Sequence, residues 1–231
     1  MATLAALTLA DARFPGGGHV HSGGVEEAVA RGLVHDVDGL AALLDGRLRT
    51  AGLVAAAFAA AACLAAPTPV EPTRAAFAEL DAELDARTPS PAQRTASRAQ
   101  GRATLRAARL AWPSPALDAL CAVDPRPHHA LLAGAVVGAD GGTPADAAQC
   151  VGYLAVSGPA SAAIRLLGLD PFAVNAVVVG LGAVLRGVVD EAVRAAPGPA
   201  SGLPAPGAPV LDLMAQAHVH HHREQVRLFA S

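Results

Sequence analysis

The stretch DPFAVNAVVVGLGAVLRGVVDEAVR at residues 170–194 has the pattern that decides the fold. Its apolar residues recur at i, i+3, i+4 and i+7, which is the spacing of one helix face; they are Val177, Val178, Leu181, Val184, Leu185, Val188 and Val189. A buried strand is the alternative for Val177–Val179, but the apolar run is too long for one. Asp170 before Pro171 also marks a helix start, because proline at the first helical position loses no hydrogen bond. We therefore predict a helix over residues 171–194.

The same start signal recurs along the chain, at Ser90-Pro91, Ser114-Pro115 and Thr143-Pro144. Helical periodicity follows each of them. The predicted helices are 2–12, 22–33, one from Asp36 or Asp38 to before Pro67, 72–87, 91–111, 115–122, 128–138, 144–167 and 171–194. We expect an all-α, single-domain helical bundle of roughly eight to ten helices. It occupies 1–194, followed by a Pro/Gly/Ala-rich flexible linker at 195–209 and a flexible partner-binding C-terminal tail at 210–231.

Composition agrees with helices and excludes several functions. The 231 residues include 57 alanines, and only 3% are aromatic, which argues against a sandwich or barrel. All 17 basic residues are arginine, and a GC-rich genome accounts for most of this bias. The net charge of −3 argues against general nucleic-acid binding.

The cysteines and the apolar segments bear on location. Cys63, Cys121 and Cys150 lie far apart, as in neither a disulfide framework nor a zinc knuckle, which favours a reducing cytoplasm. The N-terminus lacks the basic region of a secretory signal. Two long uncharged stretches, residues 51–70 and 171–185, fall short of the roughly 20 strongly apolar residues that a membrane span needs. We expect a cytoplasmic protein with buried helices.

Five arginines follow one another along the predicted helix 91–111, at positions 94, 98, 102, 106 and 109. Their spacing predicts one shared helix face, and no acid lies between residues 86 and 117. Like charges so placed require an anionic neighbour. Three alternatives supply one: the acidic helix 72–87 within the same chain, an acidic partner protein, or RNA, which the missing aromatic platforms disfavour.

The N-terminal segment FPGGGHVHSGGVE, residues 14–26, is the densest local motif. It lacks the Gly-Lys-Ser/Thr of a P-loop and the preceding strand of a dinucleotide fold. We interpret it as a structural turn formed by Pro15, Gly16, Ser22, Gly24 and Glu26, with Ser22 as N-cap of the next helix. No nucleophile elbow or His-Glu-x-x-His run occurs, so no catalytic residue is predicted.

Histidines offer an alternative function. His19 with His21, and the cluster at 218–222, have donor atoms suited to nickel or zinc. Alternate histidines in a turn are a weak metal signal, and a solvated helix face explains the cluster equally. A nickel-binding protein or metalloenzyme using His19, His21, His218 and His220 therefore stays the second hypothesis. His128 and His129 open a helix and are interpreted as structural.

Four blocks together resemble the family of urease accessory proteins UreF. They are residues 7–26, the helix motif Arg94-Thr95-Ala96-Ser97-Arg98-Ala99-Gln100-Gly101, the segment 161–169, and the ending from His218 to Arg227-Leu228-Phe229-Ala230-Ser231. The chain departs from the family pattern in three places: Asp170 replaces a glutamine, Val219 replaces a glutamate, and the turn reads Gly16-Gly17-Gly18. The low aromatic content is what an actinobacterial member would show.

The resemblance implies an all-helical, dimerising protein without catalytic activity. It would bridge the scaffold UreD (also called UreH) and the GTPase UreG, and modulate GTP-dependent nickel delivery to apo-urease. No cofactor would be stably bound: GTP belongs to UreG, and nickel passes in transit. The partner-binding residues expected from the resemblance are Arg94, Arg98, His218, Arg223, Arg227, Leu228 and Phe229. A generic helical adaptor that uses the arginines to bind an unrelated acidic protein is a third hypothesis.

Overall fold

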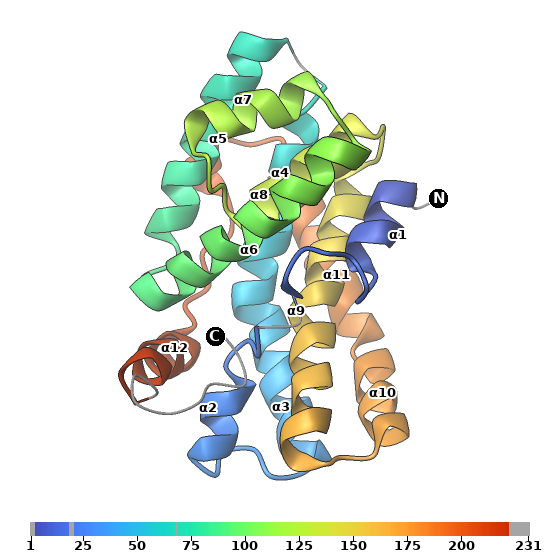
Figure 1. Ribbon diagram of the computed structural model, residues 1–231, viewed down its shortest axis with the longest axis vertical. Helices are drawn as coiled ribbons and strands as arrows, with labels where there is room; N and C mark the ends of the chain where they lie inside the picture. Colours follow the sequence, from blue (N-terminus) through green and yellow to red (C-terminus); the bar gives the residue numbers. More distant parts are fainter. Residues whose placement is uncertain (1–2, 19–20, 68, 222–231) are drawn as a thin grey trace.

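The computed structural model describes residues 3–18, 21–67 and 69–221, except for the side chains of His220 and His221 (Figure 1). Within these ranges the chain is helical and contains no strand, which confirms the all-α prediction. The helices are α1 (Leu4–Ala10), α2 (Val25–Ala30), α3 (Val37–Arg47), η2 (Leu48–Gly52), α4 (Leu53–Ala65), α5 (Val70–Ala86), α6 (Pro91–Ala111), α7 (Pro115–Val123), α8 (His129–Ala139), α9 (Pro144–Leu167), α10 (Pro171–Gly180), α11 (Gly182–Ala195), η3 (Ala200–Gly202) and α12 (Pro209–His221).

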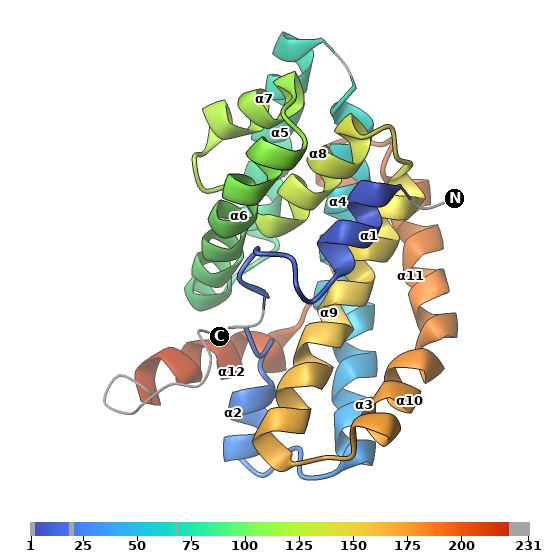
Figure 2. The same ribbon diagram turned by 45° about the vertical axis from the view of Figure 1, so that its right-hand side comes forward.

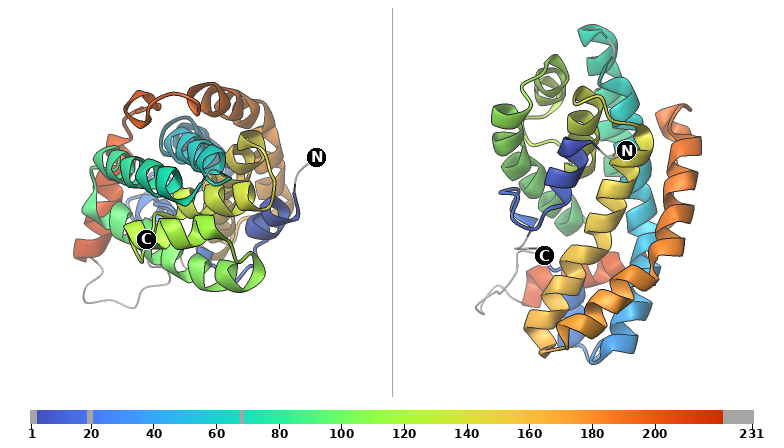
Figure 3. Two further views of the ribbon diagram at one scale, coloured as in Figure 1. Left: turned by 90° about the horizontal axis from the view of Figure 1, so that it is seen from above. Right: turned by 90° about the vertical axis from the view of Figure 1, so that its right-hand side faces the viewer.

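Helix α4 forms the centre of the bundle. It continues α3 through the π-helical turn η2, and α5, α8, α9 and α11 pack around it (Figure 3). Nearly all of its residues are buried, including the fully buried Phe58. Because α4 consists mainly of alanine, neighbouring helices approach its backbone closely.

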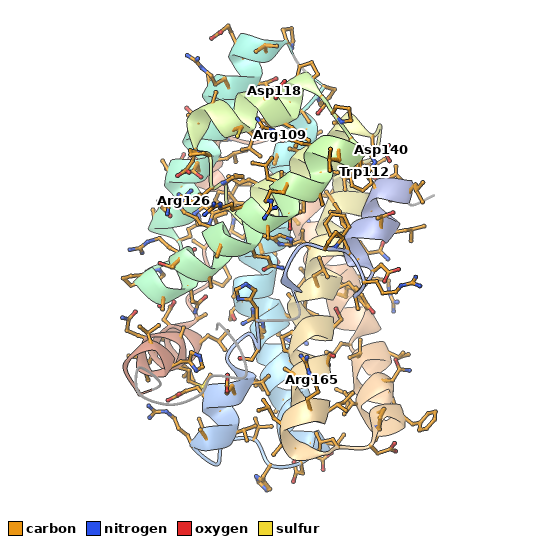
Figure 4. All side chains as sticks on the ribbon, viewed as in Figure 1. Arg109, Trp112, Asp118, Arg126, Asp140 and Arg165 are labelled. Atoms are coloured by element: carbon orange, nitrogen blue, oxygen red, sulfur yellow. The ribbon has the colours of Figure 1, made fainter. Side chains whose placement is uncertain are left out.

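The closest of these approaches lies between α4 and α8. A Cβ added to Gly134 would lie 2.1 Å from the carbonyl oxygen of Ala59, and one added to Gly138 would lie 2.4 Å from that of Cys63. Both glycines are therefore required by helix–helix distance. A separate hydrogen bond ties α1 to the end of α8, from the Ala5 amide to the Asp140 carboxylate at 3.1 Å (Figure 4).

The proline-marked helix starts are confirmed. Ser90, Ser114, Thr143 and Asp170 each accept a hydrogen bond from a backbone amide of the first turn that follows. Helices 91–111 and 144–167 have the predicted bounds, and Asp36 caps α3. The first two helices are shorter than predicted.

The prediction of a single helix over 171–194 is wrong. The segment is broken at Leu181 into two helices, α10 and α11, whose axes differ by 42°. Gly180 and Gly182 flank the break, and glycine lowers the cost of leaving helical geometry. The bend turns the side chain of Leu181 into the core, where it is buried.

The segment predicted as a linker lies along α5 in the structure. Leu203 is buried, and the guanidinium of Arg87 donates hydrogen bonds to the carbonyl oxygens of Ser201 and Leu203, at 2.9 and 3.2 Å. Helix α12 then packs against α2 and α6 (Figure 2). The part of residues 195–221 that the structure describes is thus held against the bundle by specific contacts.

By length and composition, two helical segments would suffice to cross a membrane: Val37–Ala65 and Pro144–Leu167. The bent pair α10–α11 would be a third if counted as one span. Neither segment was predicted as a membrane span from the sequence: Arg47 and Arg49 interrupt the first, and the uncharged part of the second is short, residues 147–164. In the fold, 67% of the most apolar window of the first segment and 44% of that of the second are buried inside the protein.

Candidate functional site

The arginines of α6 lie on one broad helix face, but their surroundings differ. Residues four apart on an α-helix are rotated by about 40° relative to each other, so the four from Arg94 to Arg106 span about 120°. Arg98 faces α5 and is mostly buried, whereas Arg102 and Arg106 are exposed. Helix α6 therefore has inner arginines, Arg94 and Arg98, and outer ones beyond them.

Arg98 is the centre of an ion-pair network that joins three parts of the chain. Its guanidinium lies 2.9 Å from carboxylate oxygens of Asp81 and Asp85 on α5, and 3.1 Å from Asp124 after α7. Burial disfavours the Arg98 cation, but the hydrogen bonds to Asp81 and Asp85 outweigh it and raise its pKa. The internal alternative for the arginines is thus the one realised at Arg98, whose charge is already neutralised. A partner-binding role for Arg98 stays a prediction.

Arg94 is held nearby at the start of α6. It donates hydrogen bonds to the carbonyl oxygens of Thr88 and Pro89, at 2.6 and 3.0 Å, and lies 4.0 Å from Asp85. Its side chain is one-third exposed. It shapes the turn between α5 and α6 and keeps part of its surface available.

His128 extends this network into the core. Its ring lies 2.9 Å from Ser97 Oγ and 2.8 Å from Asp85 Oδ1, and its side chain is 1% exposed. Burial and then the charge of Arg98 lower the pKa of His128, so the ring is neutral near pH 7. These are the residue types of a hydrolase triad, but Asp85 also binds Arg98. The arrangement fits a cross-link between α5, α6 and α8, which supports the structural interpretation of His128.

The N-terminal turn packs on α6. A Cβ added to Gly16 would lie 2.7 Å from Thr104 Oγ1, and one on Gly17 would lie 3.6 Å from the Ala103 side chain. The N-cap of α2 is Gly24 in left-handed geometry and not Ser22, so that part of the prediction is wrong. Ser22 is fully buried, and its carbonyl oxygen accepts from the Val25 amide at 3.2 Å. Gly24 occupies the N-cap position in place of the expected side-chain cap, because its φ of +95° is a conformation that glycine adopts without strain.

A cavity of about 450 Å³ opens between α2, α4, α6, α9 and α12. Its wall includes His21, Arg47, His128, His129 and His218, which lie far apart in sequence. Arg47 was not predicted as a site residue, because no local sequence pattern marks it. Its guanidinium donates to the carbonyl oxygens of Gly23 and Ala155, at 2.8 and 2.9 Å, and burial lowers its pKa to about 10. A buried cation in the wall makes this cavity unfavourable for a resident metal ion.

His129 also lines this cavity. Burial, and secondarily the charge of His21, lowers the pKa of His129 to about 4. The imidazole is therefore neutral at pH 7. In the described part of the chain, no group of three or more His, Cys, Asp or Glu side chains has metal-binding geometry.

The predicted tail residues divide into two groups. His218 lies on α12, is 2% exposed, and has Nε2 3.9 Å from the Glu26 carboxylate, which joins two residues that the sequence placed in separate motifs. Asp212 and Gln216 of the same helix contact Gln93 and Ser90 at the start of α6, at 3.2 and 3.4 Å. The remaining tail and metal candidates lie outside the described side chains: His19, His220, Arg223, Arg227, Leu228 and Phe229.

Comparison with known proteins gives consistent matches. The UreF family model matches residues 34–182. The urease accessory protein UreF of Mycolicibacterium vanbaalenii is 47% identical over 231 residues, covering 100% of this chain and 99% of that protein. The protein of the same name from Mycobacterium tuberculosis is 43% identical over 226 residues, 97% of each chain. These actinobacterial matches confirm the resemblance indicated by the four sequence blocks.

Proposed function

Because the chain belongs to the UreF family of urease accessory proteins, we propose that it is a non-catalytic subunit of the machinery that inserts nickel into urease. It bridges UreD (UreH) and the GTPase UreG, and modulates GTP-dependent nickel delivery to apo-urease in the cytoplasm. The observation that carries this proposal is the 47% identity to a urease accessory protein along the whole chain. Bridging involves the partner proteins UreD and UreG, so the support for this role comes from family membership.

The chemistry of the chain supports a scaffold. The sequence has no lysine to hold a nucleotide phosphate, so we assign GTP to UreG. Burial raises the pKa of Cys63 to about 11 and that of Cys150 to about 12, so these thiols are protonated and poor nickel ligands. In this proposal nickel is cargo in transit, and no cofactor is stably bound.

Two surfaces support the proposed assembly. Helix α12 leads to the family-like ending at 218–231. We assign this ending to UreD contact through Arg223, Arg227, Leu228 and Phe229, with the buried His218 holding α12 in place against Glu26. Helix α10 supports a homodimer, because its outer face carries Phe172 and Val179, whose exposed fractions are 85% and 69%. Apolar groups so exposed are typical of a covered interface.

The test uses a urease-positive host with nickel supplied. Deleting the gene should abolish urease activation, and the full chain should co-purify with UreD and UreG. Unchanged urease activity after deletion would refute the proposal. Equilibrium dialysis addresses the histidine-based alternative: stoichiometric, tight nickel that survives removal of residues 218–231 would favour a nickel-binding protein or metalloenzyme.

A further inference from the structure

The outer arginines of α6 differ from most others in the protein. Eight described arginines have a carboxylate oxygen within 4.0 Å: Arg13, Arg31, Arg49, Arg74, Arg87, Arg94, Arg98 and Arg109. Arg102 and Arg106 are exposed, and no described carboxylate lies within that distance of either. They are neighbours on one helix, so their charges add.

The charged side chains nearest to this pair on α6 are also arginines. Helix α6 contains five arginines and no acid. Arg109 flanks the pair, and its only described carboxylate neighbour is Asp118 at 3.5 Å, whose side chain is 77% exposed (Figure 4). Like charges at i, i+4 destabilise a helix unless an anionic group lies between them. Arg102 and Arg106 lie more than one turn before the end of α6. Stabilisation of cations by the helix dipole at the C-terminus therefore does not explain their position.

The segment between α7 and α8 crosses α6 so closely that a Cβ on Gly101 would lie 1.9 Å from the Pro127 carbonyl oxygen. The carbonyl oxygen of Arg126, next to Pro127, accepts a hydrogen bond from Arg98 at 3.2 Å, so this segment covers the inner side of α6. We define the outer arginine surface as Arg102, Arg106 and Arg109.

The outer arginine surface also includes an exposed apolar side chain and several small side chains. Leu110, one turn after Arg106, is 88% exposed. Alanines 99 and 103 lie between the arginines, and the Gly17 backbone lies against Ala103. Small side chains let another backbone approach the guanidinium groups.

We propose that the outer arginine surface docks an acidic amphipathic helix of a partner protein. Carboxylates one turn apart on that helix pair with Arg102 and Arg106, and an apolar residue covers Leu110. Nucleic acid fits less well, because the chain is net negative and the nearby rings of Phe14 and Trp112 pack on each other, with centroids 6.3 Å apart. The inference deepens the proposed function, on which it rests, by naming the chemistry of one partner contact.

The experiment compares the full-length protein with Arg102→Glu/Arg106→Glu. The matched control is Arg186→Glu/Arg194→Glu on α11, at the opposite side of the bundle, where Asp190 and Glu191 lie between the two arginines (Figure 3). Binding to purified UreD and to purified UreG is measured separately at low and at moderate salt. A second probe is a synthetic helical peptide with glutamates four residues apart and one leucine. Urea denaturation verifies that each variant is folded.

The proposal predicts that Arg102→Glu/Arg106→Glu weakens one partner and the peptide by about tenfold or more and reduces the salt dependence, while the control binds as wild type. Equal binding of both variants to partners and peptide would overturn it. Loss of binding to poly(U) RNA without loss of protein binding would also overturn it, in favour of RNA. If wild type binds neither UreD nor UreG but binds the peptide through Arg102 and Arg106, the proposed function fails and the acidic-helix surface stands.

Discussion

The guanidinium of Arg98 donates two hydrogen bonds to the carboxylate of Asp81, from Nη1 to Oδ1 at 3.1 Å and from Nη2 to Oδ2 at 2.9 Å. This bidentate pair joins α6 to α5, and both side chains are about 15% exposed. Asp85 and Asp124 complete the coordination of the same cation. One arginine therefore bridges three carboxylates that would otherwise repel each other.

Replacement of this arginine should be costly. Arg98→Ala leaves the three carboxylates without their counter-charge, and we expect a loss of about 2–4 kcal/mol in the free energy of unfolding. Urea denaturation followed by circular dichroism measures it. Arg102→Ala on the exposed side of the same helix is the control and should change stability by less than about 0.5 kcal/mol. Equal effects of the two substitutions would contradict the distinction between inner and outer arginines.

A methyl group on Gly101 should separate α6 from the segment that crosses it. The added Cβ would lie 1.9 Å from the Pro127 carbonyl oxygen, so one of the two backbones would have to shift. We expect Gly101→Ala to destabilise the protein by about 2–3 kcal/mol. Gly187→Ala within α11 is the control, because nothing lies within 4 Å of its added Cβ. That control should stabilise by up to about 1 kcal/mol through helix propensity, and its destabilisation would count against this account.

Acidification should weaken the protein through His129. Its pKa of about 4 lies below the value of about 6.5 for an unfolded chain, so the unfolded state binds the proton first. The stability is therefore fully present above pH 6.5 and is lost as the pH falls toward 4. We expect His129 to account for about 1–2 kcal/mol of loss between pH 7 and pH 5. Unfolding free energies at the two pH values should differ less in His129→Gln, and an unchanged difference would rule His129 out as the source.

The three cysteines should react unequally. Burial raises the pKa of Cys63 and Cys150, whereas Cys121 is partly exposed. Because the thiolate is the reactive form, iodoacetamide at pH 8 should label Cys121 first in the folded protein. Mass spectrometry of digested samples identifies the labelled residue. In urea all three should react, and rapid labelling of Cys150 without denaturant would contradict its burial.

Local signals in the sequence predicted the helices better than their interactions. The caps at Ser90 and Thr143 determine where α6 and α9 begin, because the hydrogen bonds involved span only three residues. The break at Leu181 depends on how that side chain reaches the core, so periodicity alone continued the helix through it. The contact of Glu26 with His218 and the cavity position of Arg47 join residues far apart in the chain. No local pattern encodes such distances, and the same is true of the carboxylates around Arg98, which come from α5 and from the segment after α7.

The backbone contact between α4 and α8 has an evolutionary consequence. We interpret most of the alanine and glycine abundance in this chain as an effect of genomic base composition, which drifts between lineages. At Gly134 and Gly138, however, any side chain would meet the carbonyl oxygens of Ala59 and Cys63. In a lineage with AT-rich codons, exposed arginines are free to become lysines, whereas these two positions stay glycine. Sequence divergence in this family should therefore be slowest along a line of small residues inside the bundle.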